Sequence, residues 1–138
     1  MRKRTQSREF ALQILYKMDV TKEEGQASLD NFWAYNSQGE ISDESKNFTA
    51  ELVKGVEANI GIIDEKIRKY AANWQLERMA VVDRNILRMS CFELLYRDDI
   101  PPKVSINEAV ELAKKYSGLE AGKFVNAILD KVKIEKEK

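Results

Sequence analysis

A cluster of basic residues at the start of the chain is the first candidate for binding chemistry. Arg2, Lys3, Arg4 and Arg8 lie before and within the first turn of a predicted helix. Cations there oppose the helix dipole, so helix stability does not explain them. The free N–H groups of a helix start bind phosphate, and arginine adds paired donors. The cluster therefore predicts an anion-binding arm, with a merely solubilising tail as the alternative.

The second candidate is the segment Lys123-Phe124-Val125-Asn126. Phe124 falls on the apolar stripe of a predicted helix, which favours packing in the core. A phenylalanine between a cation and an amide is also suited to stack on an unpaired nucleic-acid base. Tyr16, at the end of the first apolar stripe, belongs either to the core or to its edge.

A polar strip interrupts an otherwise apolar helix and is the third candidate. It consists of Asp83, Arg84, Arg88 and Glu93. Unpaired charges on a buried helix cost several kcal/mol, so the strip favours a paired, partly buried ion network. The alternative is a docking strip for a partner protein.

Composition excludes most enzyme chemistry. The chain contains no histidine, which excludes imidazole bases and Ser-His or Cys-His pairs. Its one cysteine, Cys91, excludes an intramolecular disulfide and thiolate-rich metal sites. Phosphate-binding glycine loops and the common hydrolase motifs are absent. We therefore expect a protein that is not an enzyme and needs no cofactor or metal. A free cysteine and no export signal favour the cytoplasm.

The net charge of zero hides an uneven distribution. The 23 basic residues balance the 23 acidic ones over the whole chain. Residues 1–17 nevertheless hold five basic residues and one acidic one, whereas residues 18–51 hold two basic and eight acidic residues. The field around the molecule is therefore not uniform, and the two segments are suited to different partners.

Hydrophobic periodicity predicts an all-α protein of about seven helices. Apolar stripes indicate helices over residues 6–19, around 29–33, from 43 with a break at Gly61, and over 79–96. Trp74 and Leu76 are expected to plug the space between elements. The helix over 79–96 is apolar nearly all round, which is typical of the centre of a bundle. We predict one domain, residues 1–138, in two packed helical subdomains of about 1–75 and 76–138.

The remaining elements are predicted from local signals. Pro101 and Pro102 end the central helix. Ser105 and Glu108 fit a capping box, which predicts a helix start at Ser105 and an end near Tyr116, with Gly118 as the stop. The last helix runs from about Ala121 into a Lys/Glu tail that is expected to fray.

Several blocks of the sequence together resemble the NusB family of bacterial transcription antitermination factors. They cover nearly the whole chain: Arg8-Glu-Phe-Ala-Leu-Gln-Ile-Leu-Tyr16 after a basic arm, Phe48 with Leu52-Val-Lys-Gly-Val56, Val82-Asp-Arg-Asn-Ile-Leu-Arg88, Phe92-Glu-Leu94, Asp99 to Lys114 with Ser-Ile-Asn-Glu-Ala, and Lys123-Phe-Val-Asn-Ala-Ile-Leu-Asp-Lys131. The Ile-Asn-Glu-Ala and Lys-Phe-Val-Asn blocks are the specific ones.

The resemblance implies an RNA-binding adaptor of the transcription machinery. Family members bind the single-stranded boxA element of ribosomal RNA operons together with NusE, a small-subunit ribosomal protein, and join elongating RNA polymerase. When the functional positions of the family are carried over residue by residue, the resemblance implies an RNA-binding set. Its members are Arg2, Lys3, Arg4, Arg8, Tyr16, Lys123, Phe124 and Asn126. The implied partner-binding set is Glu77, Asp83, Arg84, Arg88 and Glu120.

Three other functions are weighed against this one. A protein–protein scaffold without RNA contact would use the acidic segment 18–51 and the polar strip. A helix-turn-helix regulator of duplex DNA needs a basic recognition helix, whereas the helices predicted near 105–117 and 120–133 are balanced in charge. A similar helical domain precedes the methyltransferase domain of some ribosomal RNA cytosine methyltransferases, but with the chain ending at Lys138 we expect the stand-alone factor.

Overall fold

Seven α-helices and one short 3-10 turn make up the fold of the computed structural model, which describes residues 3–36, 39, 41–71 and 73–137. No strand is present in these ranges, so the prediction of an all-α protein with about seven helices is confirmed. The elements are α1 (Lys3–Thr21), α2 (Gly25–Tyr35), α3 (Asp43–Ala58), α4 (Ile60–Tyr70), η1 (Leu76–Arg78), α5 (Val81–Tyr96), α6 (Pro102–Tyr116) and α7 (Leu119–Glu137).

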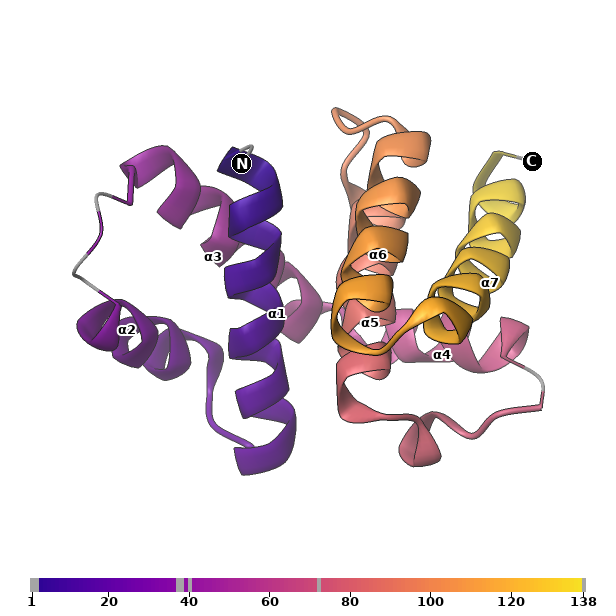
Figure 1. Cartoon of the computed structure of the whole chain (residues 1–138), viewed down its shortest axis with the longest axis horizontal. Coiled ribbons are helices and arrows are strands. Elements are labelled where there is room, and N and C mark those ends of the chain that lie inside the picture. The colour runs from indigo at the N-terminus through magenta and orange to yellow at the C-terminus, as the bar shows by residue number, and fades with distance from the viewer. Residues whose placement is uncertain (1–2, 37–38, 40, 72, 138) are drawn as a thin grey trace.

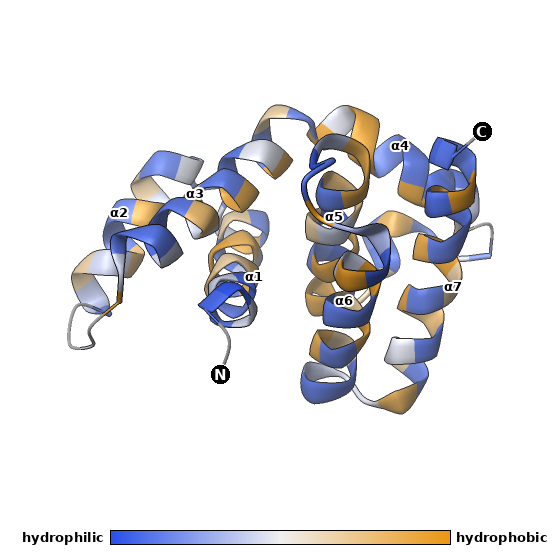
Figure 2. Cartoon of the chain, turned by 90° about the horizontal axis from the view of Figure 1, so that it is seen from above, coloured by the Kyte–Doolittle hydropathy of each residue, from blue (hydrophilic) through white to orange (hydrophobic). Residues whose placement is uncertain are grey.

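The helices form two groups that lie side by side (Figures 1 and 2). Helices α1, α2 and α3 pack on one another, whereas α4 packs on α5 and α7, and α6 packs on α5 and α7. The chain therefore passes from one group to the other at Asn59, between α3 and α4. The boundary expected near residue 75 lies instead within the second group, because α4 contributes its buried face to that group.

Helix α5 forms the centre of the fold. It contacts α1 and α3 of the first group and α4, α6 and α7 of the second. Ile86, Leu87, Met89 and Cys91 are each fully buried on it. The hydrophobic core is thus continuous across the two groups, as the nearly all-apolar surface of this helix predicts. Burial raises the pKa of the Cys91 thiol to about 12, so this cysteine remains protonated at neutral pH.

Helices α3 and α5 approach closely at Gly55. A Cβ atom on Gly55 would lie 2.2 Å from the ring of Phe92. The Phe92 ring in turn stacks on Tyr96 with 5.6 Å between ring centroids. A residue without a side chain is therefore required where α3 crosses this ring pair, which explains the glycine in Leu52-Val-Lys-Gly-Val56.

Helix α6 starts earlier than the capping-box pattern predicts. It begins at Pro102, where the missing N–H and fixed φ suit a first helical residue. Ser105 and Glu108 are therefore inside the helix. The Ser105 hydroxyl donates to Glu93, and the Glu108 carboxylate accepts from Thr5, both on other helices. The predicted stop is confirmed: Gly118 has φ 114° and donates its N–H to Ala113.

Two further helix boundaries differ from the predictions. The break between α3 and α4 falls at Asn59, whose side chain donates to the Gly55 carbonyl at 2.8 Å, and Gly61 lies inside α4. The last helix continues through the Lys/Glu tail to Glu137. Its end is held by Lys66, 3.0 Å from Glu135, and by Lys136, 2.8 Å from Asp98. Local sequence does not reveal these partners, so the pattern predicts fraying where the structure has a helix. No helix in the described part of the chain is long and apolar enough to cross a membrane.

Candidate nucleic-acid interface

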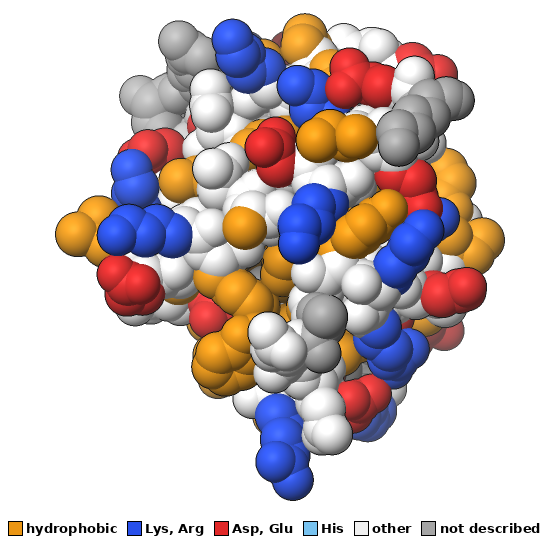
Figure 3. Space-filling view, turned by 90° about the vertical axis from the view of Figure 1, so that its right-hand side faces the viewer, with side chains coloured by type: hydrophobic (Ala, Val, Ile, Leu, Met, Phe, Trp, Pro, Cys, Tyr) orange, Lys and Arg blue, Asp and Glu red, His pale blue; other side chains and the backbone are white. Residues whose placement is uncertain are grey.

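The largest groove described on the surface lies where the loop before η1 meets the start of α7. Its volume is about 760 Å³. Figure 3 looks onto this side of the molecule, where apolar side chains gather low on the face among basic and acidic ones. The lining residues are Trp74, Arg78, Met79, Ala80, Asp83, Ser117, Glu120, Ala121, Lys123 and Phe124.

Two aromatic rings form the apolar part of this groove. Trp74 and Phe124 meet edge to face, with 5.9 Å between ring centroids and 72° between planes. Phe124 is partly buried and packs against the core, whereas Trp74 is 61% exposed. Phe124 thus packs on the core, as its apolar stripe predicts, and also lines the groove, whereas its stacking on a base stays a prediction. Leu76 is buried as predicted, but Trp74 does not act as a plug between elements.

Charged groups surround the two rings. Lys123 is 76% exposed and lies 3.5 Å from Glu120, which is 90% exposed. Asp83 accepts a hydrogen bond of 2.6 Å from Ser117 at the corner between α6 and α7. Arg78 adds a second cation. Apolar rings bordered by cations and by hydrogen-bonding side chains are a combination suited to unpaired nucleic-acid bases.

The basic arm lies at the other end of the molecule. The amino end of α1 and the loop before η1 are on opposite sides in Figure 1. Lys3 and Arg4 are exposed, with Lys3 3.8 Å from Glu44 and the Arg4 guanidinium 4.3 Å from the centroid of the Phe48 ring. Arg2 lies outside the described residues. No residue of α1 lines the groove, so arm and groove are separate surfaces.

Arg8 does not belong to the exposed arm. Its side chain is 3% exposed and is bound to Glu93 at 2.7 and 2.8 Å and to Glu108 at 3.0 Å. Ser105 donates to the same Glu93 carboxylate at 2.8 Å. These donors and acceptors join α1 to α5 and α6. The expectation that Arg8 contacts RNA is therefore corrected, because its guanidinium is already used inside the fold.

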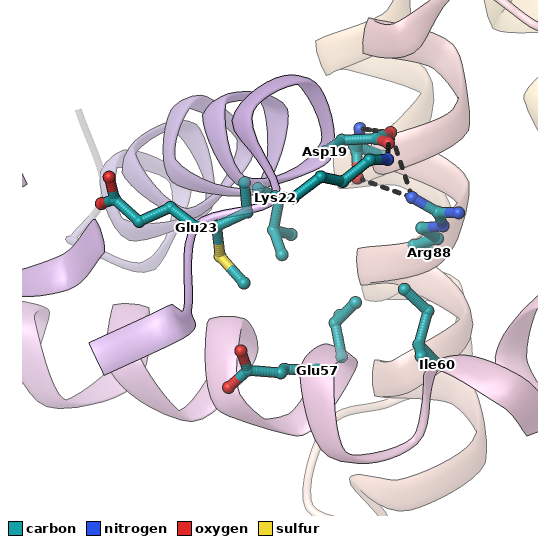
Figure 4. A pocket seen from close by; sticks show the side chains of 10 residues that line it. Asp19, Lys22, Glu23, Glu57, Ile60 and Arg88 are labelled. Atoms are coloured by element: carbon teal, nitrogen blue, oxygen red, sulfur yellow. Dashed lines mark hydrogen bonds and ion pairs between the residues drawn. The ribbon is translucent and has the colours of Figure 1, made fainter. Parts of the chain in front are cut away.

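Two residues of the polar strip on α5, Arg84 and Arg88, belong to an ion network of the kind that the sequence favoured. Asp19, at the end of α1, accepts from Arg84 at 2.8 Å, from Asn85 at 2.9 Å and from Arg88 at 3.1 Å. Arg88 also binds Asp64 of α4 at 2.8 Å. Figure 4 shows Arg88 reaching Asp19 beside a small pocket. Arg84 and Arg88 therefore join α5 to α1 and α4, as the ion-network alternative predicts.

The Asp19 carboxylate makes this network sensitive to acid. Burial alone would raise its pKa, but hydrogen bonds from Arg84 and Asn85 and the charge of Arg88 outweigh burial and hold the pKa below its ordinary 3.8. A lowered pKa contributes stability that is present above pH 3.8 and is lost as pH falls through the folded-state pKa. We expect Asp19→Asn to be less stable than wild type at pH 7, and the difference to shrink below about pH 3.8.

Urea unfolding at a series of pH values measures this effect. Asp30→Asn is the matched control, because Asp30 is an exposed carboxylate that accepts from Gln26 within α2. Its unfolding free energy should follow the wild-type curve. A difference between Asp19→Asn and wild type that stays constant down to pH 2.5 would contradict the role given to this carboxylate.

The structure brings some of the expected site residues together and separates others. The groove contains Asp83, Glu120, Lys123 and Phe124. Exposed residues outside its lining are Tyr16, Asn126 and Glu77, the last paired with Arg68 at 2.8 Å. Sequence reasoning did not include Trp74, Arg78 and Met79 in the site. The available signal was a tryptophan in the link between two predicted helices, and its exposure is visible only in the structure.

Comparisons with known proteins give one consistent result. A family model described as the NusB family matches residues 5–133. The transcription antitermination proteins NusB of Thermodesulfovibrio yellowstonii and Anaeromyxobacter dehalogenans are 44% and 48% identical over 94% of this chain, and the matches cover 91% and 89% of those proteins.

Solved structures of NusB proteins have the same fold as this chain. A structure of T. maritima NusB is 34% identical, with a TM-score of 0.86, over 96% of this chain and 91% of that one. A complex of antitermination factors NusB and NusE with double-stranded RNA contains a chain that is 27% identical, with a TM-score of 0.87, over 98% of both chains.

Proposed function

The chain belongs to the NusB family of transcription antitermination proteins, and from this premise we propose that it binds single-stranded boxA RNA together with NusE and so supports elongation by RNA polymerase. A cytoplasmic location follows from that role. The observation that carries the proposal is the groove in which Trp74 and Phe124 present aromatic surface between the cations Arg78 and Lys123. A neighbouring structure of NusB and NusE with double-stranded RNA supports RNA binding together with NusE.

The arm and the groove have different tasks in this proposal. Lys3 and Arg4, together with Arg2, neutralise phosphates and attract RNA of any sequence. Phe124 and Trp74 stack on unpaired bases, while Lys123 and Asn126 contact the strand beside them. Tyr16 lies on α1, the helix that carries the arm, and is 43% exposed, so we assign it to a path that connects the two regions.

The exposed carboxylates near the groove fit the partner protein better than RNA. Glu77, Asp83 and Glu120 repel phosphates but can pair with lysine or arginine side chains of NusE. Glu120 is 90% exposed and Glu77 is 66% exposed, so both are open to a partner. RNA and NusE would therefore meet at the edge of the same groove.

The salt dependence of RNA binding tests the proposal. For single strands, log K falls with log salt by about 0.7 for each phosphate neutralised. Lys3→Ala/Arg4→Ala should therefore flatten the slope for boxA RNA by about 1.4 and weaken binding at low salt. Fluorescence anisotropy of labelled RNA between 50 and about 300 mM salt measures both quantities.

The matched control removes two exposed cations elsewhere. Lys54→Ala/Lys69→Ala takes the same charge from α3 and α4. It should leave the slope near the wild-type value. Equal slopes for wild type and the arm variant would exclude the arm from RNA binding. Binding of NusE without any binding of RNA would favour the protein–protein scaffold instead.

A further inference from the structure

A second, smaller groove lies between α1 and α2, away from the groove at Trp74 and Phe124. Figure 1 shows the two helices side by side at the edge of the first group. The volume of this groove is about 160 Å³, close to the ~150 Å³ of a cavity known to hold benzene. Its lining residues are Gln13, Ile14, Lys17, Ser28, Asn31, Phe32, Tyr35 and Asn36.

An exposed tyrosine stands at the edge of this groove. Tyr35, the last residue of α2, is 86% exposed, the largest value among the exposed large apolar side chains described. The fold gains little from such a side chain, because almost none of its surface is removed from water. A tyrosine held open in this way offers a flat ring on which a ligand can stack.

The groove is held in a fixed shape. Phe32 packs against Phe10 at 5.4 Å and Trp33 at 5.1 Å between ring centroids. The Asn36 side chain and backbone N–H both donate to the Phe32 carbonyl, at 2.8 and 2.9 Å, which closes α2. Tyr35 therefore projects from a helix end that is closed by these two hydrogen bonds.

The polar groups of this groove suit the edge of a base and do not suit a phosphate. Three amides, Gln13, Asn31 and Asn36, supply both donors and acceptors. Lys17 is the one cation of the lining and lies 3.7 Å from Glu23. The Glu23 carboxylate also accepts from Ser28 at 2.8 Å and from Asn31 at 3.2 Å. Attraction to phosphate is therefore cancelled locally, while amides and an aromatic ring remain.

We propose that the α1–α2 groove receives one unpaired base of the bound RNA, which stacks on Tyr35 and hydrogen-bonds to the amides. This inference rests on the proposed function and adds a base site to it. The base belongs to RNA beyond the segment held at Trp74 and Phe124. The strand reaches it past Tyr16, which precedes Lys17 of the groove on α1.

Tyr35→Ala tests the base site. Loss of one stacked base predicts boxA RNA binding weaker by about 5- to 150-fold. The salt slope should remain at the wild-type value, because no phosphate contact is removed. Tyr35→Phe keeps the ring and should bind nearly as wild type does. Ile62→Ala, which removes an exposed apolar side chain of α4, is the control and should not change RNA affinity.

The possible results separate this inference from the function on which it rests. If wild type binds boxA RNA and Tyr35→Ala binds it equally well, the base site is refuted and the proposed function stands. If Tyr35→Ala weakens binding of NusE and not of RNA, the groove belongs to the protein partner and the inference is again refuted. If wild type does not bind RNA at all, the proposed function itself fails. Circular dichroism of each variant confirms that the fold is unchanged.

Discussion

Replacing Glu93 by alanine is expected to lower the free energy of unfolding by about 3–5 kcal/mol. Glu93 is 1% exposed and accepts from Arg8 and Ser105. Its removal leaves the Arg8 guanidinium buried, with only the partly exposed Glu108 as a counter-charge. An uncompensated buried charge is among the largest single costs in a folded protein. The midpoint and slope of urea unfolding measure the loss.

A double substitution is the matched control for this prediction. Arg8→Met/Glu93→Leu removes both charges and fills the space with apolar atoms, which is often neutral or stabilising. We expect the double variant to recover most of the stability lost in Glu93→Ala. A loss below about 1 kcal/mol for Glu93→Ala would show that the pair between α1 and α5 does not hold the two helical groups together.

Replacing Phe124 or Trp74 by leucine is expected to weaken boxA RNA binding by about 5- to 150-fold, since each stacked base contributes about 1–3 kcal/mol. Leucine keeps an apolar side chain against the core and removes the flat ring. Because Trp74 and Phe124 are in contact, their effects should not add: the double variant should lose less than the product of the single losses. Anisotropy titrations of the three variants measure these ratios.

Thermal melting separates loss of binding from loss of structure. Trp74 is 61% exposed, so Trp74→Leu should melt as wild type does. Val20→Leu, at an exposed apolar residue near the end of α1, is a control with the same final side chain and should bind RNA normally. If Phe124→Leu unfolds the protein while Trp74→Leu leaves RNA binding unchanged, the base-stacking role of the two rings is refuted.

Periodic features of the sequence were sufficient to predict most of the fold. The apolar stripe at Phe48, Leu52 and Val56 indicates α3, and the nearly all-apolar surface between Met79 and Tyr96 indicates a central α5. Such signals depend on residues three or four apart, which lie on the same face of a helix whatever the tertiary structure is. The family blocks added the candidate site at Phe124.

Long-range ion pairs account for the main errors. Ser105 and Glu108 have the spacing of a capping box, yet Glu93 and Arg8 bind them from other helices. Arg8 follows Arg4 by one turn, but the two differ because α5 supplies a carboxylate to Arg8 alone. A pairing between residues 8 and 93 leaves no trace in local spacing, so a sequence pattern cannot distinguish an anion-binding arginine from a buried one.

The groove illustrates a second limit. Phe124 is recognisable from its neighbours Lys123 and Asn126, whereas Trp74 and Arg78 reach the same place only because the chain between α4 and α5 folds back beside α7. The residues that a loop side chain contacts depend on tertiary packing, which the hydrophobic periodicity of the sequence does not reveal. The unusual exposure of Tyr35 likewise becomes visible only when the packing of α2 against α1 is known.

Tryptophan fluorescence tests the central claim most directly. The chain has two tryptophans, and Trp33→Phe leaves Trp74 as the only indole, at the edge of the groove. Titration of this variant with boxA RNA should change the Trp74 emission in a saturable way, with the same dissociation constant as anisotropy of the labelled RNA. RNA binding seen by anisotropy with no change in Trp74 emission would contradict a base-stacking groove at Trp74 and Phe124.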